Sequence, residues 1–119
     1  MRLGRLDLEV GLVRDAEPLL AAVFDVIENR YQEPISLRDV ADALALTTGH
    51  LTTLVGRRTG RTVQQWITER RMREARRLLA DTDVTIGEIA GRVGYRDAGY
   101  FTRRFRAAHD MTPHAWRGA

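Results

Sequence analysis

Residues 86–117 read IGEIAGRVGYRDAGYFTRRFRAAHDMTPHAWR, and their pattern of apolar residues occurs a second time in residues 37–66, LRDVADALALTTGHLTTLVGRRTGRTVQQW. The offset is 49 residues between Leu37 and Ile86 and 50 residues between Leu51 and Phe101, so one turn is a residue longer. Each copy predicts a helix, a tight turn and a second helix, the unit that places a recognition helix in the DNA major groove. The other repeated positions are Val40, Ala41, Leu44, Val55, Thr62 and Trp66, matched by Ile89, Ala90, Val93, Phe105, Thr112 and Trp116.

The periodicity predicts an all-α fold of seven helices without a sheet. Ser36 with Asp39, and Thr62 with Gln65, have the spacing of helix-starting capping boxes. Two helix-turn-helix subdomains, at about 36–59 and 85–109, are expected within a domain over 18–119, joined by a long linker helix at about 63–80. That linker would be roughly 27 Å long at 1.5 Å per residue. Successive major grooves repeat every ~34 Å, so one chain can place both units on one DNA face.

Residues 1–17 lack this helical pattern. Leu6, Leu8, Val10 and Leu12 alternate with polar or small residues, which is typical of a short strand or an extended segment. We expect an N-terminal arm or a linker to another domain.

The charge is concentrated in the second half of the chain. All 19 basic residues are arginine; residues 1–60 hold 7 of them against 9 acidic residues, and residues 61–119 hold 12 against 7. This asymmetry is expected where the second half meets an anionic partner. Because cysteine is absent, disulfides and thiolate metal sites are excluded. No apolar run is long enough to span a bilayer, so we expect a cytoplasmic protein without a membrane partner.

The second recognition helix, expected at 97–109, has distinct apolar and basic faces. Phe101 and Phe105 are predicted to face the core, with Ala98 and Ala108 on the same stripe. Arg103 points farthest from that stripe and is the best candidate for a bidentate contact to guanine. The same face carries Arg96, Gly99 and Arg106, flanked by Tyr100 and Arg104.

The first recognition helix, expected at 48–59, is different. With Thr48, Leu51 and Val55 facing inward, the outward positions are Gly49, Thr53 and Gly56, flanked by His50, Thr52 and Arg57. These groups have little hydrogen-bonding reach. Threonine methyls can contact a thymine methyl, but this helix can equally lie over phosphates alone. We expect the second unit to carry more sequence specificity.

Two further groups of arginines have different expected roles. Most arginines of the linker helix are predicted to be solvated or paired, with Glu69–Arg73 and Arg70–Glu74 at helical i,i+4 spacing. Arginines near the end of the first recognition helix are better candidates for phosphate contacts, which position a protein without specifying sequence. The first group is Arg70, Arg71, Arg73, Arg76 and Arg77, and the second is Arg57, Arg58 and Arg61.

The chain resembles the AraC/XylS family of bacterial transcription regulators over about residues 19–117. The second unit carries the resemblance through Ile86-Gly-Glu-Ile-Ala90, Gly94-Tyr-Arg-Asp97, Tyr100-Phe-Thr-Arg103, Thr112-Pro113 and Trp116-Arg117. The first unit and the linker helix match through Ser36-Leu37, Val40-Ala41, Gly60, Trp66-Ile67, Arg71-Met72 and Leu78-Leu79. The resemblance implies binding to asymmetric DNA sites and activation through RNA polymerase. It implies base contacts from Gly49, Thr52, Thr53, Gly99, Tyr100 and Arg103.

The chain departs from the family pattern at several positions. Thr53 stands where an arginine is common, and Val55-Gly56 where a Phe-Lys pair is common, which weakens base reading by the first unit. Gly99 replaces a serine and Asp110 a glycine. Family members usually carry a separate effector-binding or dimerisation domain. We therefore expect either a stand-alone regulator or, preferably, an excised DNA-binding domain that is monomeric in isolation.

Other functions are less consistent with the sequence. Three histidines, one serine and no nucleotide-binding or hydrolase motif leave little catalytic material, so neither an enzyme nor a cofactor is expected. A nonspecific DNA-binding protein or a helical protein-interaction module is the alternative. A nonspecific binder would show similar affinity for any duplex and a steep salt dependence.

Overall fold

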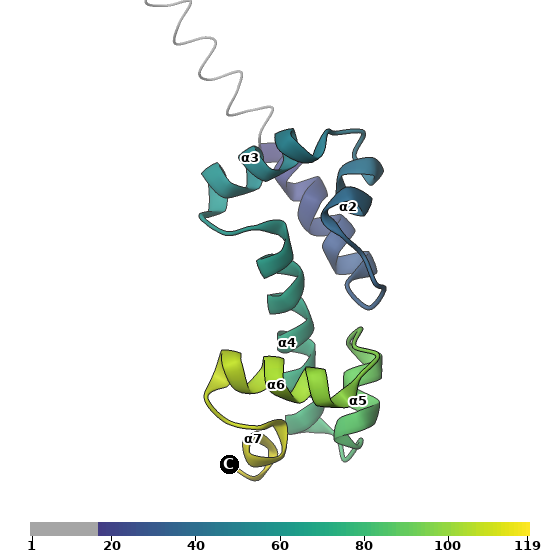
Figure 1. The fold of residues 1–119 in the computed structure, drawn as a ribbon, viewed down its shortest axis with the longest axis vertical. Coiled ribbons are helices and arrows are strands. Elements are labelled where there is room, and N and C mark those ends of the chain that lie inside the picture. The colour runs from purple at the N-terminus through teal and green to yellow at the C-terminus, as the bar shows by residue number, and fades with distance from the viewer. Residues whose placement is uncertain (1–16) are drawn as a thin grey trace, which may run out of the picture.

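The computed structural model describes residues 17–119, which form seven helices and no strand (Figure 1). The predicted all-α fold with two helix-turn-helix units is confirmed. The expected arm lies outside the described residues, except that Glu17 already belongs to the first helix. That helix covers residues 17–30, followed by α2 (Leu37–Ala43), α3 (Thr48–Thr59), α4 (Val63–Asp81), α5 (Ile86–Arg92), α6 (Ala98–His109) and α7 (Pro113–Gly118).

Side-chain caps determine where the helices begin. In α2, the Ser36 hydroxyl accepts a hydrogen bond from the Asp39 N–H (3.2 Å), and the Asp39 carboxylate accepts one from the Ser36 N–H (2.8 Å). The bonds that the carboxylate accepts, from the Ser36 N–H and from the Ser36 hydroxyl (2.9 Å), hold the pKa of Asp39 below its ordinary value. Thr62 and Gln65 form the same reciprocal pair at the start of α4. Each pair satisfies two N–H groups that the helix itself leaves without acceptors.

The two recognition helices end in the same backbone conformation. Gly60 follows α3 with φ 74°, and Asp110 follows α6 with φ 59°. Left-handed backbone is favoured by glycine and is tolerated by aspartate better than by most residues. The aspartate at position 110 therefore ends α6 as the glycine ends α3.

The apolar residues form two separate cores, one in each unit. The first core gathers residues from the first helix, α2 and α3 around the N-terminal half of α4. The second gathers residues of α5 and α6 around the C-terminal half of α4. Ile67 belongs to the first core and Met72 to the second, and both are fully buried. One helix therefore runs through both units and connects them.

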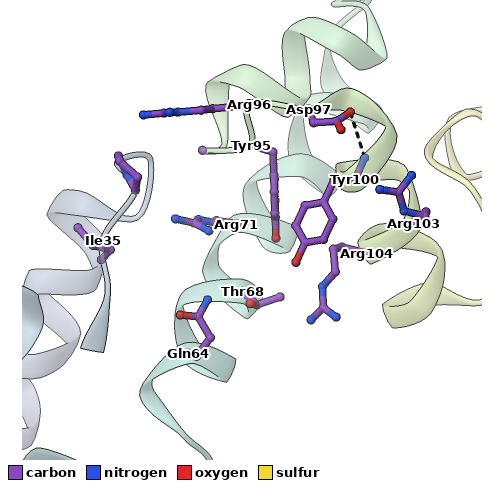
Figure 2. Close-up of a pocket in the computed structure, with 12 residues that line it drawn as sticks. Ile35, Gln64, Thr68, Arg71, Tyr95, Arg96, Asp97, Tyr100, Arg103 and Arg104 are labelled. Carbon is purple, nitrogen blue, oxygen red and sulfur yellow. Dashed lines mark hydrogen bonds between the residues drawn. The ribbon is translucent and has the colours of Figure 1, made fainter. Parts of the chain in front are cut away.

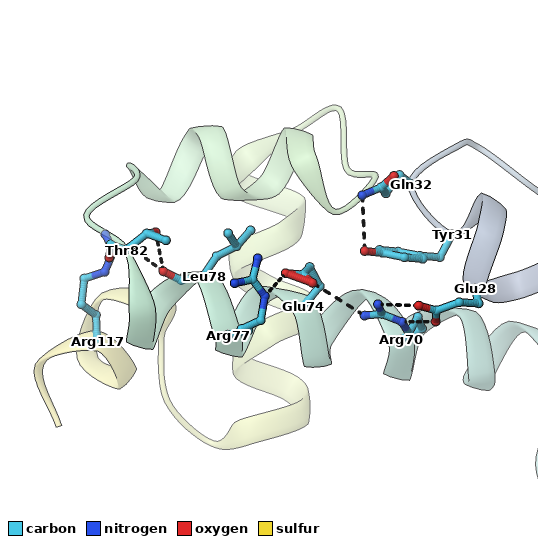
Figure 3. Close-up of polar contacts among 9 residues, drawn as sticks. All are labelled: Glu28, Tyr31, Gln32, Arg70, Glu74, Arg77, Leu78, Thr82 and Arg117. Atoms are coloured by element: carbon cyan, nitrogen blue, oxygen red, sulfur yellow. Dashed lines mark hydrogen bonds and ion pairs between the residues drawn. The ribbon is translucent and has the colours of Figure 1, made fainter.

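The last helix closes the far end of α4. Arg117 donates from Nε to the Leu79 carbonyl (3.2 Å). Its Nη2 donates to the Thr82 carbonyl (3.2 Å) and the Leu78 carbonyl (3.5 Å) (Figure 3). The final carbonyls of a helix lack N–H partners within the helix. The guanidinium supplies donors to the Leu79 and Thr82 carbonyls, whereas the Leu78 carbonyl also accepts from the Thr82 N–H (3.1 Å) and hydroxyl (2.6 Å). The guanidinium also places a positive charge at the negative end of the α4 dipole.

Several side chains differ from expectation. Ala98 and Ala108, which were expected on the apolar stripe, are exposed, whereas Phe101 and Phe105 are the residues of α6 that are fully buried in the core. Glu69 pairs with Arg76 (3.0 Å), one turn farther along than the expected Arg73. Arg70 does approach Glu74 (4.0 Å), but its closer partner is Glu28 at 2.6 Å (Figure 3). None of the helices over residues 17–119 is long and apolar enough to cross a membrane.

Candidate DNA-binding face

The two recognition helices extend to the same side of α4. In Figure 1, the C-terminal ends of α3 and α6 both lie to the left of α4, and α6 crosses in front of α4 from its start beside α5; α2 and α5 lie to the right. The 19 residues of α4 correspond to a rise of about 28 Å. This length, together with the width of each unit, is compatible with the ~34 Å repeat of the major groove.

The candidate base-reading face of α6 is held outward by its apolar anchors. Phe101 and Phe105 are 0% exposed, so the opposite face of the helix is fixed in solvent. Asp97 caps the helix by accepting bonds from the N–H groups of Gly99 (2.8 Å) and Tyr100 (3.3 Å). The guanidinium of Arg103 lies 5.9 Å from the centre of the Tyr100 ring. All candidate residues here are exposed, namely Arg96, Gly99, Tyr100, Arg103, Arg104 and Arg106.

A cleft of about 700 Å³ separates this face from the first unit. The start of α6 forms one wall and the loop at Pro34 and Ile35 the other, with α4 behind them (Figure 2). Arginines surround it, and Asp97 is the acidic residue in its lining. The cleft therefore carries positive charge and suits an anionic partner. It brings together four of the candidate residues, Arg96, Tyr100, Arg103 and Arg104, but not Arg106.

Three residues of α4 line this cleft, although none of them was expected at the DNA-binding face. Gln64 and Thr68 lie on the surface of α4 that faces the cleft. Arg71 was expected among solvated or paired arginines, but it is buried. Its spacing, four residues after Ile67 and four before Ala75, was the available signal, because both of those residues are buried and a charged residue on a buried helical stripe requires a partner.

The candidate DNA-binding face of α3 carries only short side chains and glycine. Leu51 and Val55 are fully buried, and Gly49, Thr52 and Thr53 are exposed. A Cβ atom added at Gly49 would meet nothing within 4 Å, so the backbone there is open to close approach. The structure thus presents short side chains and bare backbone on α3, and long cationic side chains on α6.

Two of the three candidate phosphate contacts of the first unit already contact other side chains of the protein. Arg57, Arg58 and Arg61 are all exposed. Arg58 forms an ion pair with Glu17, and the Arg61 guanidinium lies 4.9 Å from the centre of the Trp66 ring. A stacked or paired arginine is held in place and keeps donors for another acceptor. Over residues 17–119, no group of three His, Asp or Glu side chains is arranged to hold a metal ion.

Two helix-turn-helix units that share one connecting helix and expose a basic recognition helix define a double helix-turn-helix DNA-binding domain. A family model described as a helix-turn-helix domain matches residues 40–119. The chain belongs to the AraC/XylS family of transcription regulators.

Three similar proteins illustrate this membership. MarA, the multiple antibiotic resistance protein of Escherichia coli, is 29% identical over 96 residues, which cover 81% of this chain and 76% of MarA. The lactose operon transcription activator of Staphylococcus xylosus is 31% identical over 93 residues, which cover 78% of this chain and 33% of the activator. The chain thus spans about a third of that relative. The DNA-binding domain of AdpA, solved with a target DNA, superposes with a TM-score of 0.77 at 27% identity, over 85% of this chain and 90% of that one.

Proposed function

We propose that this chain binds specific double-stranded DNA sequences by inserting α3 and α6 into successive major grooves, and thereby regulates transcription. The observation that carries the proposal is the arrangement of the two recognition helices, whose C-terminal ends lie on the same side of a single connecting helix (Figure 1). The DNA complex of the AdpA domain supports it, since that relative has the same fold.

The base contacts are assigned unequally to the two units. Arg103 has the reach for a bidentate contact to guanine, which contributes about 1–3 kcal/mol of discrimination. Tyr100 and Gly99 lie beside it at the start of α6. In the first unit, Gly49, Thr52 and Thr53 are in the recognition position with short side chains. The proposed phosphate contacts are Arg57, Arg58, Arg61, Arg96, Arg104 and Arg106.

The regulatory role extends the same proposal. The lactose operon relative is named an activator, and we propose that this chain also activates transcription, through a contact to RNA polymerase in the bacterial cytoplasm. An effector-binding domain in the complete protein would be consistent with the short share of that relative that the chain covers. The domain by itself can contact two grooves without dimerising.

The test is the selection of bound sequences from a random duplex library at near-physiological salt, with Arg103→Ala and Thr53→Ala in parallel. Two enriched segments about one helical turn apart support bipartite recognition. We expect Arg103→Ala to erase preference in one segment and Thr53→Ala to have a smaller effect in the other. A larger loss of specificity from Thr53→Ala overturns the assignment. Absence of enrichment in the parent protein overturns specific binding and favours nonspecific binding or a protein-interaction module.

A further inference from the structure

Arg71 is the one charged side chain buried among residues 17–119, with 8% of its surface exposed. It lies in the middle of α4, between Ile67 of the first core and Met72 of the second. A buried guanidinium is costly unless its N–H groups are satisfied. Its hydrogen-bond partners here are backbone carbonyls, so it acts as a structural donor.

Both carbonyls belong to the loop that follows the first helix. Arg71 Nε donates to the Tyr31 carbonyl at 2.7 Å, and Nη2 donates to the Glu33 carbonyl at 2.9 Å. The planar guanidinium presents its donors in a fixed fork, so two simultaneous bonds determine the direction of the loop as well as its distance from α4. Arg71 therefore fastens the first unit to the centre of the connecting helix.

The turn of the second unit packs on the same group. The Arg71 guanidinium lies 5.3 Å from the centre of the Tyr95 ring. Gly94 has φ 109°, and a Cβ atom there would lie 2.8 Å from the Tyr31 carbonyl oxygen and 3.0 Å from Arg71 Nε. Burial raises the pKa of Tyr95, so its ring remains neutral beside the cation. We call Arg71, the loop 31–33 and the turn 94–95 the Arg71 junction.

We propose that the Arg71 junction fixes the angle between the two helix-turn-helix units and so sets the spacing of DNA half-sites that the domain accepts. A single connecting helix joins the units at one place, whereas the junction adds a second connection beside it. Inserting one base pair moves a half-site by about 3.4 Å and rotates it by roughly 34–36°. A domain in which the angle between the two units is fixed cannot keep both recognition helices in their half-sites after that shift and rotation. The inference about half-site spacing rests on the proposed bipartite DNA binding, whereas the inference about the angle between the two units does not.

The angle is tested without DNA. The chain contains no cysteine, so Gly56→Cys on α3 and Gly91→Cys on α5 give a clean pair of spin-label sites, and a Cβ atom at either position meets nothing within 4 Å. Double electron–electron resonance measures the distribution of distances between the labels. We expect a narrow distance distribution in the double-cysteine protein with Arg71 intact. We expect a broader one when Arg71→Lys is added, because lysine retains the charge but cannot make the two fixed hydrogen bonds of the guanidinium. Circular dichroism checks that each variant is folded.

Two more variants separate the junction from general loss of stability. Gly94→Ala disturbs the junction from the side of the second unit, and we expect it to broaden the distribution as well. Arg73→Ala is the matched control, since Arg73 is an exposed arginine two residues along α4. A broad distribution in the unmutated background, or an unchanged width in both junction variants, overturns the inference.

The spacing is tested by affinity for the selected duplex and for versions with one base pair inserted or deleted between the half-sites. We expect either change to weaken binding by the parent protein about tenfold, equivalent to 1.4 kcal/mol. For Arg71→Lys the expected loss is about two- to threefold. If the altered spacing lowers the affinity of the parent protein and of Arg71→Lys by the same factor, the role of the junction in spacing is overturned, even where the distance distribution of Arg71→Lys is broader. Failure of the proposed function is distinguishable, because the parent protein would then select no bipartite site while the distance measurement still reports on the junction.

Discussion

The salt dependence of DNA binding gives a quantitative test of the basic face. Each phosphate neutralised contributes about −0.9 to the slope of log affinity against log salt concentration. Six phosphate-contacting arginines therefore predict a slope of about −5.4, and a roughly 1,800-fold loss of affinity between 50 and 200 mM salt. Arg106→Ala should reduce the slope to about −4.5 and the loss to roughly 500-fold. Fluorescence anisotropy with a labelled duplex measures both.

The structure predicts that the six arginines are not equivalent. Arg58 is already paired with Glu17, whereas Arg106 is exposed on α6 and has no ion pair within residues 17–119. Arg58→Ala should therefore change the slope less than Arg106→Ala. Arg73→Ala is the control, because Arg73 lies beside Glu28 (3.8 Å) and outside the cleft. An unchanged slope in Arg106→Ala, or a loss restricted to one base position, would refute the assignment of Arg106 to a phosphate.

Two further predictions concern stability. Arg117→Ala removes the guanidinium donors to the carbonyls at the end of α4 and should lower the free energy of unfolding by about 2 kcal/mol. The control, Arg92→Ala at an exposed position, should lower it by about 0.4 kcal/mol. Thermal denaturation measures both variants, and an equal loss of stability in the two would contradict this role of Arg117. The Arg70 hydrogen bond holds the pKa of Glu28 below its ordinary value of 4.5, so the pair stabilises the fold above that pH, and the contribution is lost as pH falls through the lowered value. Urea denaturation of Glu28→Gln should show a weaker loss of stability in acid, and an unchanged pH profile would argue against the pair.

Local features of the fold were predictable from the sequence. The caps at Ser36 and Thr62 start their helices as the capping-box spacing predicts, because the hydrogen bonds involved span three residues. The orientation of α6 followed from Phe101 and Phe105, which leave Arg103 on the exposed side. The two-unit architecture followed from the repeat.

Contacts between distant parts of the chain were not predictable. Glu28 and Arg70 are 42 residues apart, and i,i+4 spacing could not indicate that this pair is closer than Arg70–Glu74. Arg71 binds carbonyl groups, which every residue carries, so no charged partner in the sequence identifies its role. The assignment of individual side chains to bases or phosphates also remains a prediction, since it depends on the position of the DNA.

The division of the apolar interior into two cores has a consequence for engineering. The exposed residues of α3 belong to a unit whose apolar interior is separate from that of the α6 unit, and among the described residues the two meet at the connecting helix and the Arg71 junction. Outward-facing positions on one recognition helix can therefore be replaced without repacking the other half. Chimeras that combine the exposed face of one relative's α3 with this α6 would form a modular set of DNA readers, with the centre of α4 as the part to leave untouched.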